Sequence, residues 1–108
     1  MKTHTDIDVR TLDLARAVVA SIDADPARQG LIHARATCDR WRREIHDTPA
    51  IREWAAILEQ PWETVRSILL DESEEGCRLR QNSPFAGVLP PRIRWDIYRR
   101  HRHNPRPT

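Results

Sequence analysis

The sequence predicts an all-α protein, a single compact bundle of five or six short helices. Its apolar residues recur at intervals of three and four, which is the spacing of one face of a helix. No stretch longer than four residues alternates between apolar and polar as a half-buried strand does. At 108 residues the chain is long enough for one domain and too short for two ordinary ones.

Four apolar stripes predict the first four helices. In chain order they run from Leu12 to Ile22, from Leu31 to Ile45, from Ile51 to Leu58 and from Trp62 to Leu69. Proline follows a polar residue ahead of the last three stripes, at Asp25-Pro26, Thr48-Pro49 and Gln60-Pro61. Asp and Thr are good N-caps and proline suits the first helical position, so we expect helices to begin at these junctions.

The remaining helices are predicted from charge order and from proline. Residues 71–82 carry acids first and arginines last, the order that the helix dipole favours, although Gly76 weakens the prediction of a fifth helix. Pro90-Pro91 is expected to begin the last helix, in which Ile93 and Ile97 lie one turn apart. We expect one helical domain over residues 1–98 and a basic, frayed tail over residues 99–108.

Composition restricts the class of protein. Leu, Ile, Val and Phe number 23, and four tryptophans enlarge this modest core, which a partner or a second copy often completes in such chains. No stretch approaches the roughly 20 apolar residues of a membrane span, and the first residues lack the apolar region of a signal peptide. Two distant cysteines fit a reducing cytoplasm, and the excess of arginine over lysine fits a GC-rich bacterial genome.

Charge is distributed unevenly along the chain. Residues 1–75 carry 10 basic and 15 acidic side chains, a net charge of −5, whereas residues 76–108 carry 8 arginines and one acid, a net charge of +7. Such asymmetry indicates an interaction surface, or a basic end that folds against the acidic middle of the same chain. Both interpretations stay open at this point.

Residues 51–70, IREWAAILEQPWETVRSILL, resemble the helix-turn-helix of small bacterial transcription regulators. Ala55 corresponds to the small residue between the two helices, and Val65 and Ile68 correspond to apolar residues of the second helix. The resemblance implies DNA binding by that second helix. Its only cation is Arg66, however, and DNA affinity depends on cations that contact phosphate, so a helical hairpin packed into the core is the favoured interpretation.

The C-terminal helix interleaves arginine with aromatic residues. Trp95 and Tyr98 lie among five arginines: Arg92, Arg94, Arg99, Arg100 and Arg102. Such a combination can hold phosphates and stack on bases. Alternatively, Ile93 and Ile97 pin one face to the core, and the arginines form the solvated face.

An apolar loop precedes that helix. Phe85, Val88 and Leu89 lie between prolines, and they either close the core of their own bundle or form a preformed knob for a partner. The stretch LRQNSPFAGVLPPRIRWDIYR also resembles the C-terminal part of small helical bacterial proteins of toxin–antitoxin-type loci. This resemblance implies a regulatory, partner-binding function.

No motif predicts catalysis, a cofactor or a metal. Three Arg-to-His spacings typical of a helical ribonuclease family occur, which is about the number that chance gives with 17 arginines and five histidines. His101 and His103 could join Cys77 at zinc, but no second spaced pair completes the site. The three glycines are too far apart for a phosphate-binding loop. We therefore expect no catalytic, cofactor-binding or metal-binding residues, and no small-molecule substrate.

These observations predict a non-enzymatic, cytoplasmic, bacterial interaction or regulatory protein, similar to an antitoxin, that binds a protein partner or a second copy. The expected protein interface comprises Phe85, Leu89, Trp95 and Tyr98. The alternative is nucleic-acid binding through the helix-turn-helix-like hairpin and the C-terminal helix. The residues expected to contact nucleic acid are Arg66, Arg92, Arg94, Arg99, Arg100 and Arg102.

Overall fold

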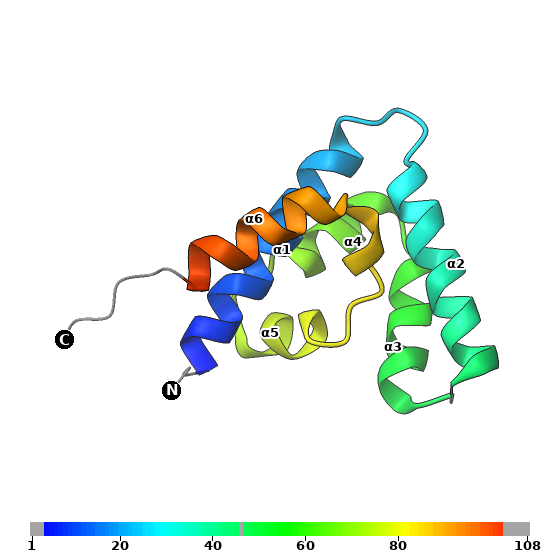
Figure 1. Ribbon diagram of the computed structural model, residues 1–108. Helices are drawn as coiled ribbons and strands as arrows, with labels where there is room; N and C mark the ends of the chain where they lie inside the picture. The colour runs from blue at the N-terminus through cyan, green and yellow to red at the C-terminus, as the bar shows by residue number, and fades with distance from the viewer. Residues whose placement is uncertain (1–3, 46, 103–108) are drawn as a thin grey trace.

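The computed structural model describes residues 4–45 and 47–102, which fold into six α-helices and contain no strand. The predicted all-α bundle is confirmed (Figure 1). The elements in chain order are α1 (His4–Asp23), α2 (Gln29–Glu44), α3 (Pro49–Leu58), α4 (Trp62–Leu69), α5 (Glu74–Arg80), the 3-10 turn η1 (Ala86–Val88) and α6 (Pro91–Arg102).

Helix α1 is the central element of the bundle. It packs against α2, α4, α5 and α6, whereas α3 packs chiefly against α2. Figure 1 shows α6 lying along α1 and running in the opposite direction. The first and last helices are therefore neighbours, and they close the core from opposite ends of the sequence.

Two of the expected proline junctions begin helices as predicted. Thr48 caps α3 by accepting a hydrogen bond from the backbone N–H of Ile51 (3.2 Å), and Pro49 is the first helical residue. Pro91 is likewise the first residue of α6. At the third junction Pro61 is itself the residue that precedes α4, so that helix begins one residue later than expected.

The prediction that Asp25-Pro26 begins a helix is wrong, because α2 starts at Gln29. The Asp25 carboxylate accepts hydrogen bonds from the backbone N–H groups of Ala27 (3.0 Å) and Gln29 (2.9 Å), which makes a turn in place of a helical first turn. Arg28 then adopts a left-handed conformation (φ 53°), and its guanidinium donates to the carbonyl of Ile22 (2.9 Å). Side-chain hydrogen bonding in this loop delays the helix by about one turn.

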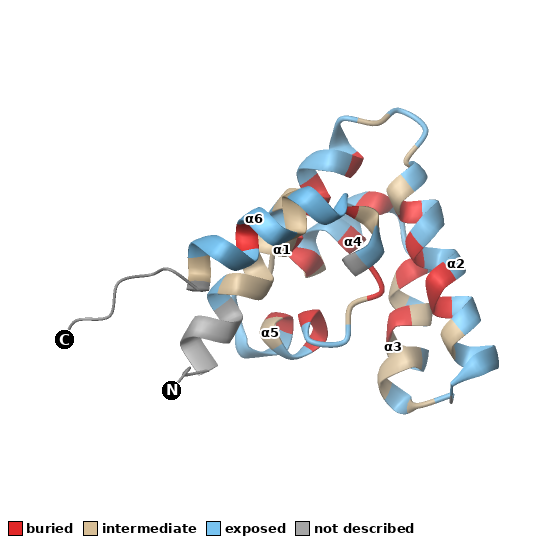
Figure 2. Cartoon of the chain, viewed as in Figure 1, coloured by how far each residue is buried: buried red, intermediate tan, exposed pale blue. Residues whose placement is uncertain are grey.

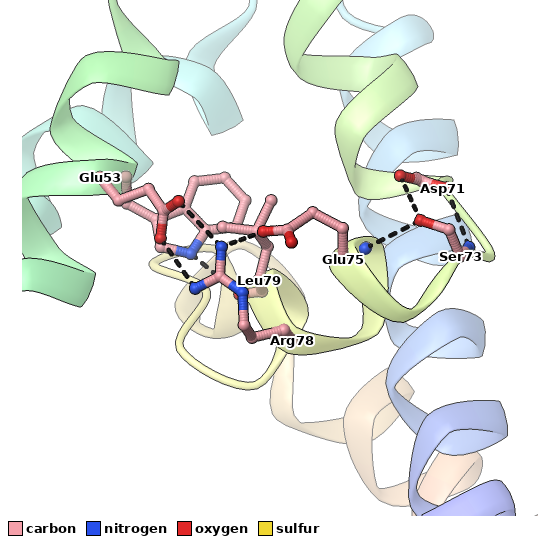
Figure 3. Close-up of polar contacts among 8 residues, drawn as sticks. Glu53, Asp71, Ser73, Glu75, Arg78 and Leu79 are labelled. Carbon is pink, nitrogen blue, oxygen red and sulfur yellow. Dashed lines mark hydrogen bonds and ion pairs between the residues drawn. The ribbon is translucent and has the colours of Figure 1, made fainter.

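Gly76, which weakened the prediction of α5, is required by the packing of that helix. A Cβ atom at this position would lie 2.0 Å from the backbone oxygen of Asp71, closer than any real contact. Ser73 caps the helix by accepting a hydrogen bond from the backbone N–H of Gly76 (3.3 Å) and donating to the Asp71 carboxylate (2.9 Å) (Figure 3). The glycine therefore allows α5 to begin directly beside the end of α4.

The core lies where the inward faces of all six helices meet, as the buried residues of Figure 2 show. The predicted stripes supply most of it: Ile22, Ala34, Trp54 and Val65 are buried, each on a different helix. One stripe ends earlier than predicted, because α2 ends at Glu44 and Ile45 is exposed. Periodicity therefore identified the buried faces of the helices, but it placed the end of α2 one residue too late.

The apolar loop packs into this core. Phe85 is 2% exposed and Leu89 3% exposed, and the ring of Phe85 meets that of Trp54 edge to face, with centroids 5.9 Å apart. The indole N–H of Trp54 donates to the backbone carbonyl of Leu79 (2.9 Å). Of the two interpretations of the loop, closure of its own bundle is the one that the structure adopts.

The expected boundary between domain and tail at residues 98 and 99 falls inside α6, which continues to Arg102. Residues 99–102 are therefore helical, and they follow the turn in which Ile97 is buried against the core. The rest of the expected tail, residues 103–108, lies outside the described residues.

Candidate functional site

The exposed surface of α6 carries two aromatic side chains. Ile97 is buried and Ile93 half-buried, which turns the opposite side of the helix outward. Trp95 is 57% exposed and Tyr98 is 36% exposed, and their rings meet edge to face with centroids 6.1 Å apart. Large exposed aromatic residues side by side are uncommon on a domain that has no partner, so this pair forms the centre of the candidate site.

Helix α1 contributes to the same surface. The guanidinium of Arg10 lies over the ring of Tyr98, 5.5 Å from its centroid, a cation–π contact. One turn further along α1, the Asp13 carboxyl group is hydrogen-bonded to Nε2 of His101 (2.8 Å). Sequence reasoning missed both α1 residues, because no local pattern in the chain connects residues 10 and 13 with the last helix.

The arginines of α6 differ in what they contact. Arg92 and Arg100 are exposed and form no ion pair within the described part of the chain, and Arg99 pairs with Asp96 of the same helix. Helical spacing places Arg92, Trp95 and Arg99 along one face. Arg94 is half-buried, with its Nε atom out of contact with solvent, and the side chain of Arg102 lies outside the described part of the structure.

The structure separates the four residues of the expected protein interface. Trp95 and Tyr98 lie together on the surface, whereas Phe85 and Leu89 lie in the core beneath it. In this conformation Phe85 and Leu89 offer almost no surface to a partner. They line a cavity together with Arg94 and Tyr98 of α6.

The hairpin of α3 and α4 has the order of a helix-turn-helix, with residues 59–61 as its turn. Its two helices pack chiefly against other partners, α3 against α2 and α4 against α1 and α5. Arg66 Nε lies 2.9 Å from the Asp23 carboxylate, which also accepts a hydrogen bond from the indole of Trp62 (2.8 Å). These two hydrogen bonds, from Trp62 first and Arg66 second, hold the pKa of Asp23 below its usual range.

The acidic middle of the chain meets the basic half at α5. Arg78 forms a two-pronged ion pair with Glu53 of α3 (2.9 and 3.0 Å) and also contacts Glu75 (Figure 3). The hydrogen bond from Arg78 lowers the pKa of Glu53, and Glu53 in turn raises the pKa of Arg78. Among the described residues, no ion pair joins an arginine of α6 to residues 44–75. The acidic middle of the chain therefore does not neutralise the described arginines of α6.

Groups that could bind a metal ion are not brought together in the described residues. No cluster of three His, Cys, Asp or Glu side chains suited to a metal occurs there, and His46 and His103 lie outside the described residues. Cys38 is buried, which raises the pKa of its thiol. None of the described helices has the length and apolar character needed to cross a bilayer.

No family model, curated protein or solved structure shows significant similarity to this chain.

Proposed function

We propose that this chain is a non-enzymatic, antitoxin-like regulatory protein that binds a protein partner with an acidic surface. The partner docks on the face of α6 and the adjoining part of α1, which we call the α6 surface and define by Arg10, Arg92, Trp95, Tyr98 and Arg99. The observation that carries the proposal is the 57% exposure of Trp95 beside Tyr98.

The composition of the α6 surface is that of an interface centre. Tryptophan, tyrosine and arginine are the residues that most often dominate binding energy at protein interfaces. Covering the exposed part of Trp95 would contribute roughly 2–3 kcal/mol at about 25 cal/mol per Å² of buried apolar surface. Arg92 is free to pair with a carboxylate of the partner. Arg10 is already held over Tyr98, so it loses little side-chain freedom on binding.

Nucleic acid is the second candidate, and a specific observation favours it. Trp95 lies between Arg92 and Arg99 on one face of α6, an arrangement that could stack a base between two phosphate contacts. Arg66, the cation expected to serve the same function on α4, is engaged by Asp23. A nucleic-acid site would therefore comprise α6 without the hairpin.

Salt dependence and one pair of variants distinguish the candidates. The protein serves as bait in a partner screen, and each complex is then reconstituted from purified components. Self-association is measured by sedimentation, and binding of duplex DNA and RNA by fluorescence anisotropy. A protein complex should persist between roughly 50 and 200 mM salt and weaken at least thirtyfold with Trp95→Ala, which is about 2 kcal/mol. The control Ile32→Ala removes an equally exposed apolar residue from α2 and should change nothing.

Two results would overturn the protein-binding proposal. One is a complex with DNA or RNA that weakens steeply with salt and is lost on changing Arg92 and Arg99 to Ala, since counterion release governs phosphate binding. The other is a protein complex whose affinity is the same for the wild type and for Trp95→Ala.

A further inference from the structure

A partly enclosed cavity of about 160 Å³ lies beneath α6, between α1, the end of α5 and the apolar loop. Most of its wall is apolar. The apolar lining is supplied by Leu14, Ala15, Val18, Leu69, Phe85 and Leu89. An apolar cavity of about 150 Å³ in another protein is large enough to hold benzene, so this one can enclose a small organic group.

Two arginines line the same cavity, and no acidic residue whose side chain the structure describes does. Arg80 is 5% exposed, a degree of burial that is rare for a guanidinium without a carboxylate partner. Its terminal nitrogens donate to the backbone carbonyls of Leu69 (3.2 Å) and Asp71 and contact the sulfur of Cys77 (3.3 Å). The hydrogen bonds of Arg80 therefore go to neutral groups only, and the Asp71 carboxylate interacts with its charge without a direct ion pair.

Both arginines keep one donor unused. Among the described residues, the buried side-chain nitrogen and oxygen atoms that lack a hydrogen-bond partner are Nε of Arg80 and Nε of Arg94. Both atoms belong to residues that line this cavity. Buried donors are nearly always satisfied in folded proteins, and leaving one unpaired costs about 1–3 kcal/mol, more for a charged group. Two such donors on residues that line one cavity suit an acceptor that the protein itself does not supply.

We propose that this cavity binds a small monocarboxylic acid whose apolar body is about the size of benzene. The carboxylate would accept hydrogen bonds from Arg94 and Arg80, and the apolar body would contact the lining from α1 and the loop. Charge-assisted bonds from guanidinium to carboxylate are among the strongest in proteins, and the apolar wall lowers the local dielectric. This site adjoins the partner-binding face, because Tyr98 lines the cavity and also belongs to the α6 surface, whereas Trp95 does not line the cavity.

Benzoate is the probe for this proposal, and calorimetric titration of the full chain is the measurement. Benzamide has the same shape without the charge, and sulfate has charge without an apolar body. Benzoate should bind at least about tenfold more tightly than either, the effect of one charge-assisted hydrogen bond or more. In a ¹H–¹⁵N spectrum its addition should shift the backbone signals of Ala15, Val18 and Arg94. Equal binding of benzoate and benzamide, or binding of sulfate alone, would overturn the proposal.

A matched pair of variants locates the carboxylate. Arg94→Gln removes a charge from the cavity, whereas Arg92→Gln removes one from the exposed side of the same helix, two residues away. The first should weaken benzoate binding about tenfold or more and the second should not. Ala15→Val, which places two methyl groups in the cavity, should also abolish binding while circular dichroism shows the helices intact. Equal losses with both arginine variants would mean that benzoate binds to surface charge, which contradicts the proposal.

Discussion

The segment from α3 to α5 and the last helix both carry arginines, but the two regions use them in opposite ways. In the first region Arg66 and Arg78 pair with carboxylates from other helices, and Arg80 is held by backbone carbonyls. In α6, Arg92 and Arg100 have no ion-pair partner in the described structure, and Trp95 is largely exposed. An arginine side chain connects helices where an acceptor of another helix lies within reach. Where no such acceptor lies within reach, the arginine remains available for binding.

The largest effect expected from this contrast is a difference in stability between variants of two tryptophans. Trp54 is buried and touches Phe85 and Leu79, so Trp54→Ala should lower the free energy of unfolding by about 3–5 kcal/mol. Trp95→Ala should change it by no more than about 0.5 kcal/mol, because Trp95 contributes little to the core. Urea titration followed by circular dichroism measures both. Similar losses from the two variants would show that α6 serves the fold as much as α3 does.

A smaller effect is expected at the cap of α5, in the region where polar groups serve the fold. Ser73→Ala removes the acceptor for the backbone N–H of Gly76 and should cost about 1 kcal/mol in the same titration. Ser67 is the matched control, since its hydroxyl only donates to the carbonyl of Glu63 within α4. Ser67→Ala should leave stability unchanged or raise it slightly, because alanine is the better helix former. If both variants cost the same, the cap does not stabilise α5.

The smallest expected effect depends on pH and concerns the junction of α1 and α4. Because folding lowers the pKa of Asp23, ionised Asp23 stabilises the folded state at neutral pH, and this contribution is lost as the pH falls through its folded pKa. Asp23→Asn should therefore be less stable than the wild type at pH 7, with a difference that shrinks toward acid. Asp39→Asn, an exposed position on α2, is the control. A difference that stays constant with pH would mean that the charge of Asp23 does not act on stability.

Sequence reasoning succeeded where the physical cause is local. Helical periodicity identified the buried faces of Ile22, Trp54 and Val65, and Thr48-Pro49 located the start of α3, since caps and stripes involve residues within a turn of one another. It failed at Asp25, where side-chain hydrogen bonds to the next residues compete with helix formation.

The candidate surface was only partly predictable. Trp95 and Tyr98 could be named from the sequence, because they lie among arginines on one helix and Trp95 is opposite Ile97. The partners of this helix in space could not, since Arg10 and Asp13 meet it only after the chain has folded back on itself. Nor could periodicity decide whether Phe85 faces inward, because the loop that carries it has no repeating geometry.

The pairing of α1 with α6 also has a consequence for how the protein is made. A ribosome completes α1 early, but the Asp13–His101 contact joins residues 88 positions apart. Closing so long a loop adds little entropy cost, because that cost grows only slowly with length. The pairing of α1 with α6 is delayed instead by the order of synthesis. The side of α1 that α6 covers stays exposed until α6 has emerged from the ribosome. During that interval the nascent chain exposes apolar surface, which is when a chaperone would bind it most readily.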